Sequence, residues 1–187
     1  PEHFLVINGM DFGWDHPQSH IQMWIDPDDW CVYIAQAMKA SKLQPYEVWE
    51  RIKPWAKDVP SAEPADGFQT EKGTGKTQKS YYEEAGWEMC DSHATWPDGG
   101  VSVEQSLIEL YKLIQLGRFK IFDHLAEVFD EFMQYHRDES GKIVKVKDDI
   151  ISAIRYAYMM RRHAIRKADI GASYEDDDIQ TNNSRWA

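Results

Sequence analysis

An aspartate at the end of an apolar run is the feature that most constrains this chain. The run 4–7 (FLVI) is followed by Asn8-Gly9-Met10 and then by Asp11. Such a run, rich in β-branched residues and bounded by glycine, is typical of a buried strand. A carboxylate at the end of a buried strand costs free energy unless a cation neutralises it. The sequence therefore predicts a positive partner for Asp11, although an ordinary turn residue before Gly13 is the simpler alternative.

Three more acids take comparable positions later in the chain. Asp66 stands in a Pro-Ala-Asp-Gly turn, and Asp148 and Asp149 open a long helical pattern. Few His or Cys residues lie near them, so the acids suggest a site for hard cations, Mg²⁺ or Mn²⁺. With two ions about 3.5–4 Å apart, Asp11 would bridge both, Asp66 and Asp149 would flank them, and Asp148 would support them. A turn residue for Asp66 and a helix cap for the pair are the ordinary alternatives.

The rest of the pattern predicts one mixed α/β domain. A chain of 187 residues with 42% hydrophobic content can bury a substantial core. No apolar run approaches the roughly 18 residues of a membrane span. The two cysteines fit no zinc spacing and suit a reducing cytosol. We assign residues 1–168 to the domain and expect the polar, acidic tail 169–187 to be disordered.

The expected elements alternate after an initial meander of strands. Strands are expected at about 4–11, 20–25, 30–39, 59–63, 87–90 and 118–122. Helices are expected at about 46–56, 78–85, 102–116, 124–135 and 148–167. The segment 135–147 alternates polar and apolar residues around a Ser-Gly turn and indicates a β-hairpin.

Charge leaves the partner of this domain open. The net charge of −11 disfavours a nucleic acid, but Lys and Arg outnumber acids between Arg137 and Lys167. The loop segment 73–77 (GTGKT) resembles the end of a phosphate-binding loop, yet Thr70 replaces the required first glycine. We treat the bases of this loop and of the predicted hairpin as hypothetical phosphate contacts: Lys72, Lys76, Arg137, Lys142, Lys145 and Lys147.

Several segments together resemble the C-terminal nuclease domain of phage large terminase subunits, of the headful-packaging, short-tailed phage type. These segments are 9–17 (GMDFGWDHP), 64–67 with 71–75, 117–122, 135–137 and 147–157 (KDDIISAIRYA). Carried over by position, Asp11 matches the first acid of that family and Asp66 the second. The Asp148-Asp149 pair holds the third, for which we prefer Asp149. Many relatives carry a further acid where Ser152 stands here.

The resemblance implies an RNase H-like mixed sheet flanked by helices. It implies Mg²⁺- or Mn²⁺-dependent cleavage of concatemeric double-stranded viral DNA in the host cell cytoplasm. An ATPase domain would precede this one in the full-length chain, as a start at Pro1 rather than Met suggests, and the portal and small terminase subunit would be partners. Two alternatives stay open: another RNase H-like nuclease (resolvase-like or integrase-like), and a catalytically idle module that docks on the portal or small terminase subunit.

Overall fold

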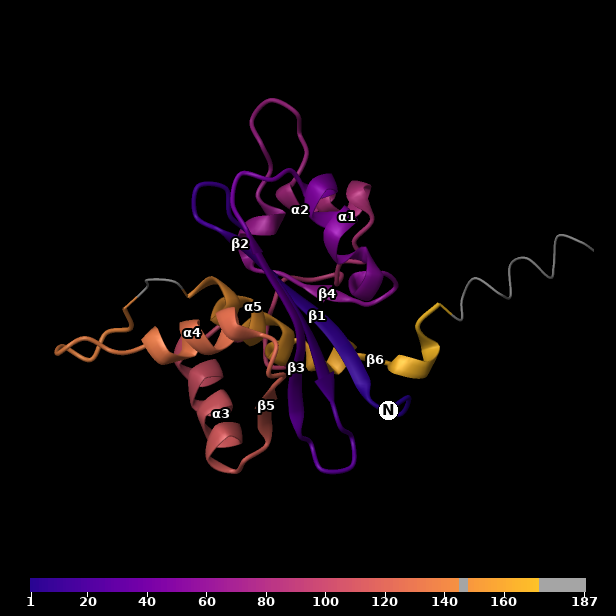
Figure 1. The fold of residues 1–187 in the computed structure, drawn as a ribbon. Coiled ribbons are helices and arrows are strands. Elements are labelled where there is room, and N and C mark those ends of the chain that lie inside the picture. Colours follow the sequence, from indigo (N-terminus) through magenta and orange to yellow (C-terminus); the bar gives the residue numbers. More distant parts are fainter. Residues whose placement is uncertain (145–147, 172–187) are drawn as a thin grey trace, which may run out of the picture.

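A central antiparallel meander organises the fold. In the computed structural model, which describes residues 1–144 and 148–171, β1 (Leu5–Asp11), β2 (Gln18–Ile25) and β3 (Val32–Ala40) pair in sequence order (Figure 1). At the edges, β5 (Phe119–Ile121) pairs parallel with β3, and β4 (Ser61–Ala62) pairs parallel with β1. The sheet order is β4-β1-β2-β3-β5. The first predicted strand therefore lies inside the sheet.

Five α-helices of the described chain cover the two faces of this sheet. On one face α5 (Asp149–Met159) crosses β1 and β2, and α3 (Val103–Gln115) and α4 (Ala126–Gln134) pack against it. On the other face lie α1 (Pro45–Ala56) and α2 (Gln78–Ala85) (Figure 1). The described residues include no helix with the length and apolarity that a bilayer crossing requires. The predicted mixed α/β architecture is confirmed.

Alternate residues of β1 face the two helical layers. Ile7 belongs to the core beneath α5, whereas Met10 belongs to the core beneath α1 and α2. The buried Asn8 amide faces α1, where its Nδ2 donates to the carbonyl oxygens of Ala56 and Val59 at 3.1 and 3.2 Å. By the same alternation, the side chain of the last residue of β1 lies on the α5 face. That residue is an aspartate, so a carboxylate is delivered under α5.

Gly9 lets α5 approach the sheet closely. A Cβ atom at Gly9 would lie 2.2 Å from the carbonyl oxygen of Ala153 and 2.9 Å from the Cβ of Ala157. Real Cβ atoms do not approach other atoms that closely, so this contact requires glycine. The beginning of α5 consequently rests over the carboxyl end of β1.

Helix ends mostly follow the predicted signals. Ser102 caps α3, because its Oγ accepts the N–H of Gln105 at 3.2 Å. Gly86 ends α2 with a positive φ of 125°. The segment 87–90, expected to be a short strand, contributes only a bridge between Met89 and Ser61. In this chain, capping residues and glycines therefore predict where helices begin and end better than a short apolar stretch predicts a strand.

The last helix ends earlier than predicted. A helix was expected over 148–167, but α5 stops at Met159. There the guanidinium of Arg161 donates to the carbonyl oxygen of Tyr158 at 2.8 Å, which satisfies an acceptor at the helix end. After the 3-10 turn η2 (Arg161–His163), the chain forms the strand β6 (Ile165–Arg166), which pairs antiparallel with β1. Pairing at the sheet edge thus overrides helix propensity.

The carboxyl end of β6 (Ile165–Arg166) continues into the 3-10 turn η3 (Lys167–Asp169). The backbone N–H of Lys167 donates to the carbonyl oxygen of Phe4 at 2.8 Å, so this segment packs on the N-terminal one. The proposed boundary at residue 168 stays a prediction, because residues 172–187 of the expected tail lie outside the described residues. The same holds for residues 145–147 of the expected hairpin.

Candidate active site

One polar residue from each strand of the meander forms a row beneath the start of α5. Asp11 of β1 is opposite Ser19 of β2, and Ser19 is opposite Lys39 of β3. Opposed residues in antiparallel strands have Cα atoms about 4.5–5.5 Å apart, so the row is short. The Oγ of Ser19 donates to the carbonyl oxygen of Asp149 at 2.6 Å. This bond fixes the first residue of α5 above the row.

The strand β4 brings Asp66 to the same edge of the sheet. Because β4 runs parallel to β1, with Ala62 beside Gly9, the carboxyl ends of both strands point the same way. Asp66 then lies exposed in the first turn of η1 (Ala65–Phe68), directly after β4. A Cβ at Gly67 would lie 2.3 Å from the Oε2 of Glu63, so glycine leaves room here for the Glu63 side chain.

The electrostatics of Asp11 place the other predicted acids in its neighbourhood. Burial, followed by the negative charges of Asp66, Asp149 and Asp148, raises the pKa of the Asp11 carboxyl from 3.8 to about 7, and the Arg155 guanidinium partly opposes this rise. Charges from two other segments therefore act on one half-buried carboxyl group. Such a cluster would gain free energy from a bound cation.

No three of the four predicted acids, all within the described part of the chain, place one donor atom each within 4.8 Å of one another. Within the described residues, only His3, Asp26 and Asp28 place one donor atom each within 4.8 Å of one another, and Asp28 is 85% exposed in a turn. The oxygens of the predicted acids are spread more widely. For two ions about 3.5–4 Å apart, with metal–oxygen bonds of about 2.1 Å, ligands on different ions can be about 8 Å apart. Acids too far apart to share one ion can therefore still hold two.

The site contains a buried ion-pair network that sequence analysis missed. The Nζ of Lys39 lies 2.8 Å from the Oδ2 of Asp149 and 2.9 Å from the Oε2 of Glu131. The other oxygen of Glu131 accepts the N–H of Ile151 at 2.8 Å, in the first turn of α5. Glu131 thus holds the amino end of this helix and, through Lys39, the side chain of Asp149. The sequence did contain a sign that Glu131 is buried, because it follows Val128 by three residues and so lies on the apolar side of its helix.

Arg155 is the second cation near the acids. It is 6% exposed, and its Nε donates to the Oγ of Ser106 at 2.7 Å. Because Ser106 belongs to α3, this bond fixes Arg155 between two helices while its charge acts on Asp11. The site therefore combines carboxylates with one buried and one half-buried cation and is not a simple acidic patch.

Two of the predicted phosphate contacts are paired with acids. The ammonium of Lys76 lies within 2.7 Å of both carboxylate oxygens of Glu84. The guanidinium of Arg137 donates two bonds of 2.9 and 2.6 Å to Glu104. A phosphate would have to compete with these carboxylates.

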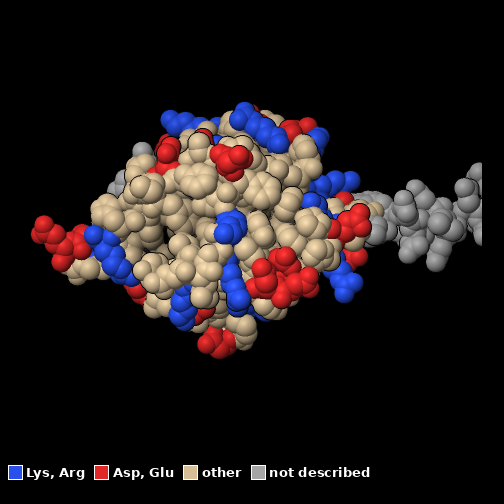
Figure 2. Space-filling model, turned by 60° about the horizontal axis from the view of Figure 1, so that its bottom comes forward, with Lys and Arg blue, Asp and Glu red and all other residues tan. Residues whose placement is uncertain are grey.

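Of the other four predicted bases, two lie within the described residues and two do not. Lys72 and Lys142 are exposed and have no carboxylate partner among the described residues, whereas Lys145 and Lys147 lie outside that part of the chain. The loop that carries Lys72 projects at the top of Figure 1, and the segment around Lys142 projects at the left. On the face in Figure 2, basic and acidic side chains are interspersed around a broad uncharged area.

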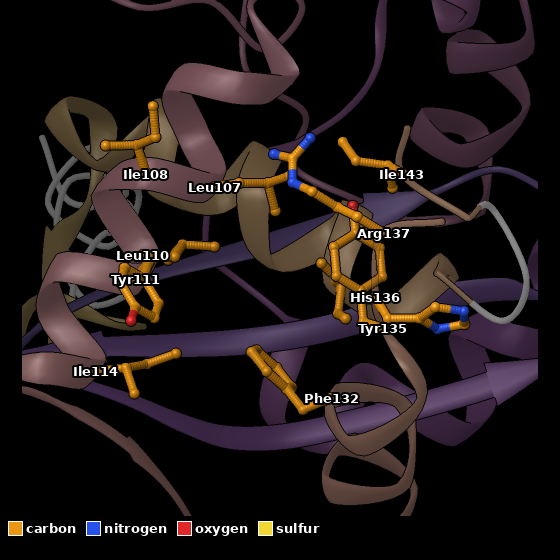
Figure 3. A pocket seen from close by; sticks show the side chains of 11 residues that line it. Leu107, Ile108, Leu110, Tyr111, Ile114, Phe132, Tyr135, His136, Arg137 and Ile143 are labelled. Carbon is orange, nitrogen blue, oxygen red and sulfur yellow. The ribbon is translucent and has the colours of Figure 1, made fainter. Parts of the chain in front are cut away.

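An apolar groove of about 390 Å³ lies between α3 and the segment 132–143. Figure 3 shows that side chains from these two parts point toward one another across it. Its lining is mainly aliphatic and aromatic and includes none of the four predicted acids. The groove is therefore separate from the candidate cation site.

A Lys39→Met variant tests the ion-pair network. We expect it to destabilise the metal-free protein by about 3 kcal/mol, because two buried carboxylates lose their shared cation. Added Mn²⁺ should restore part of this loss. Thermal melts in EDTA and in Mn²⁺ measure both effects, with Lys53→Met, which breaks an exposed pair with Glu50, as the control. A Lys39→Met protein that melts like the wild type in EDTA would contradict the network.

Fold and site together define an RNase H-like domain with acids at the carboxyl end of its first strand. Residues 8–161 match the Terminase RNaseH-like domain family, and the chain belongs to this family. The resemblance noted in the sequence and the fold that it implied are both confirmed.

Two curated relatives are large terminase subunits. The chain is 50% identical over 170 residues to the large subunit of Salmonella phage P22, covering 91% of the chain and 34% of the relative. It is also 50% identical over 161 residues to that of Enterobacteria phage LP7, covering 86% and 34%. The chain thus spans about a third of the length of these relatives.

Solved structures agree with this assignment. The P22 large terminase nuclease domain matches with a TM-score of 0.86 and 50% identity, covering 91% of this chain and 88% of that one. The nuclease domain of the large terminase g2p from bacteriophage SPP1, solved with bound Mn, matches with a TM-score of 0.52 and 18% identity. That match covers 82% of this chain and 84% of the other, and it shows a shared fold.

Proposed function

We propose that this domain is a metal-dependent endonuclease that cleaves concatemeric double-stranded viral DNA during headful packaging, by two-metal phosphodiester hydrolysis. The observation that carries the proposal is the half-buried Asp11, whose pKa is raised to about 7 by burial and by acids from two other segments. When bound, two Mg²⁺ or Mn²⁺ ions would activate the attacking water and stabilise the leaving oxygen. The Mn bound by the g2p nuclease domain supports a divalent metal here.

Each acid has a role in this proposal. Asp11, Asp66 and Asp149 would hold the ions, with Asp11 in the central position, and Asp148 would support them. Lys39 keeps the Asp149 carboxylate oriented through their 2.8 Å contact. The role of Lys39 is therefore one of positioning.

The substrate would be held by bases from the two projecting segments. Lys72 and Lys142 are available for phosphate contacts, and Lys145 and Lys147 remain candidates by sequence. Lys76 would first have to leave its partner carboxylate. Because the net charge is −11, we expect weak DNA affinity for the isolated domain.

The remaining partners follow from the relatives. They are large terminase subunits about three times as long as this chain. We therefore propose that the domain works within a longer chain that includes an ATPase domain. The portal and the small terminase subunit would be its other partners, in the host cell cytoplasm.

Cleavage of supercoiled plasmid tests the nuclease proposal. We expect nicking and linearisation with Mg²⁺ or Mn²⁺, none in EDTA, and a loss of at least about 10³-fold in Asp11→Ala. Asp98→Ala is the control for losing an acid outside the site, since Asp98 stands in a Pro-Asp-Gly turn like that of Asp66 and accepts the N–H of Gly100. Its activity should equal that of the wild type. Equal cleavage by Asp11→Ala would contradict the site.

Other substrates separate the alternatives. Preferential cleavage of an RNA–DNA hybrid would favour a different RNase H-like nuclease, and preferential cleavage of a four-way junction would favour a resolvase. Absence of cleavage with every metal and substrate would favour an idle docking module. We expect linear and supercoiled duplex DNA to be cut at least as fast as either special substrate.

A further inference from the structure

A second cavity opens next to the candidate active site. It measures about 730 Å³ and lies between the β1–β2 loop, the start of α1, η1 and α2. Asp66, one of the proposed metal ligands, also lines this cavity. Phe12, which directly follows Asp11, lines it as well. Whatever binds here would therefore lie beside the reacting phosphate.

The cavity presents aromatic surface. The indole of Trp14 is 49% exposed and has no ring contact in the described part of the chain. Phe12 packs against Tyr82 with ring centroids 5.2 Å apart, and Gly67 makes room for it, since a Cβ there would lie 2.7 Å from the Phe12 ring. Tyr81 is held by a 2.8 Å hydrogen bond from its hydroxyl to Glu71. The rings other than Trp14 are thus fixed in place, and Trp14 offers a free π face.

The charge of the lining excludes a phosphate group. Two of the described lining residues, Asp66 and Glu71, are acidic, and none of them is Lys, Arg or His. A phosphate would be repelled there. A neutral planar group with hydrogen-bonding edges suits the cavity better, because Gln78 adds an amide without a partner among the described residues.

We propose that this cavity receives one unstacked nucleobase, adjacent to the phosphate that is cleaved. The inference rests on the proposed function and specifies how the substrate strand is held. Bases stack on aromatic side chains whatever their identity, so the site would add affinity with little sequence preference. A paired base must first leave the duplex, which is easiest at a mismatch.

Binding of DNA duplexes to the Asp11→Asn domain, which should not cleave them, tests whether the cavity receives a base. Fluorescence anisotropy would compare duplexes of one sequence that carry, at one base pair, either a mismatch or two opposed abasic sugars, which leave no unpaired base. We expect the mismatched duplex to bind about tenfold more tightly than the abasic one, because only the former can place a base on Trp14. Adding Trp14→Ala should reduce this ratio to about one, whereas Trp14→Phe should keep most of it.

Trp30→Ala is the matched control, because Trp30 is similarly exposed, at 56%, but lies in the β2–β3 turn outside this cavity. It should keep the full ratio. A ratio near one with Trp14 intact, or a tenfold ratio that survives Trp14→Ala, would overturn the proposal. The base site and the nuclease proposal can fail separately. If the domain cleaves plasmid but binds the mismatched and abasic duplexes equally, only the base site is contradicted. If it prefers the mismatched duplex but does not cleave plasmid, only the nuclease proposal is contradicted.

Discussion

Asp11→Asn is expected to make the metal-free protein more stable above pH 7 while removing the proposed metal site. Burial and the neighbouring acids raise the pKa of Asp11 from 3.8 to about 7. Below about pH 4 this carboxyl is protonated in both the folded and the unfolded chain. Between about pH 4 and 7 the folded chain keeps a proton that the unfolded chain has lost, so the free energy of unfolding falls as pH rises. Asparagine removes this penalty, on the order of 2–4 kcal/mol at pH 8.

Thermal melts from pH 4 to 9 in EDTA measure the effect. The melting temperature of Asp11→Asn should exceed that of the wild type by roughly 5–10 °C at pH 8, and by little at pH 4. Glu63, whose pKa is also raised to about 7 by burial, titrates in both proteins, so the difference between the two curves isolates Asp11. Mn²⁺ should stabilise the wild type and not the variant. A difference that does not change with pH would contradict the raised pKa.

Gly9→Ala is expected to lift α5 from the sheet. The new Cβ would meet a backbone oxygen, that of Ala153, at 2.2 Å, and a backbone atom cannot rotate away. Moving the helix should cost about 3 kcal/mol of stability. It would also lengthen the bond between Ser19 and Asp149 that holds the start of α5. A shift of about 1 Å in a catalytic carboxylate can reduce cleavage about 100-fold.

Denaturant unfolding and plasmid cleavage measure these two losses. Gly73→Ala is the control, because a Cβ at Gly73 has open space around it and the substitution is chemically the same. It should change stability by less than about 0.5 kcal/mol and leave cleavage unaltered. If Gly9→Ala behaves like Gly73→Ala, the close contact between α5 and β1 does not position the site.

The acids were predictable because each stands at the end of an element. Asp11 ends an apolar strand, Asp66 follows a short one, and Asp149 begins a helix, so local pattern alone selected them. The sequence pattern did not show that these acids lie near one another in the folded chain. That proximity depends on the parallel pairing of β4 with β1 and on the seating of α5, which connect residues more than 50 positions apart.

The counter-charges of the site were not predictable in the same way. Lys39 joins the site because strand register places it two strands from Asp11, and a bulge between Gln22 and Met23 contributes to that register. From its neighbours in the sequence, Glu131 is simply one acid on an amphipathic helix. The pair of Arg137 with Glu104 is equally invisible in the sequence, because the two residues are 33 positions apart. The helix predicted over 148–167 was also wrong at β6, because these residues pair with β1 instead of continuing the helix.

Anomalous diffraction from crystals soaked in Mn²⁺ tests the metal centre most directly. Two peaks, about 3.5–4 Å apart, are expected between the carboxylates of Asp11, Asp66 and Asp149. Asp11 should contact both ions. At saturating Mn²⁺, density only at the exposed turn of Asp26 and Asp28, or none among the three acids, would contradict a dinuclear site in this domain.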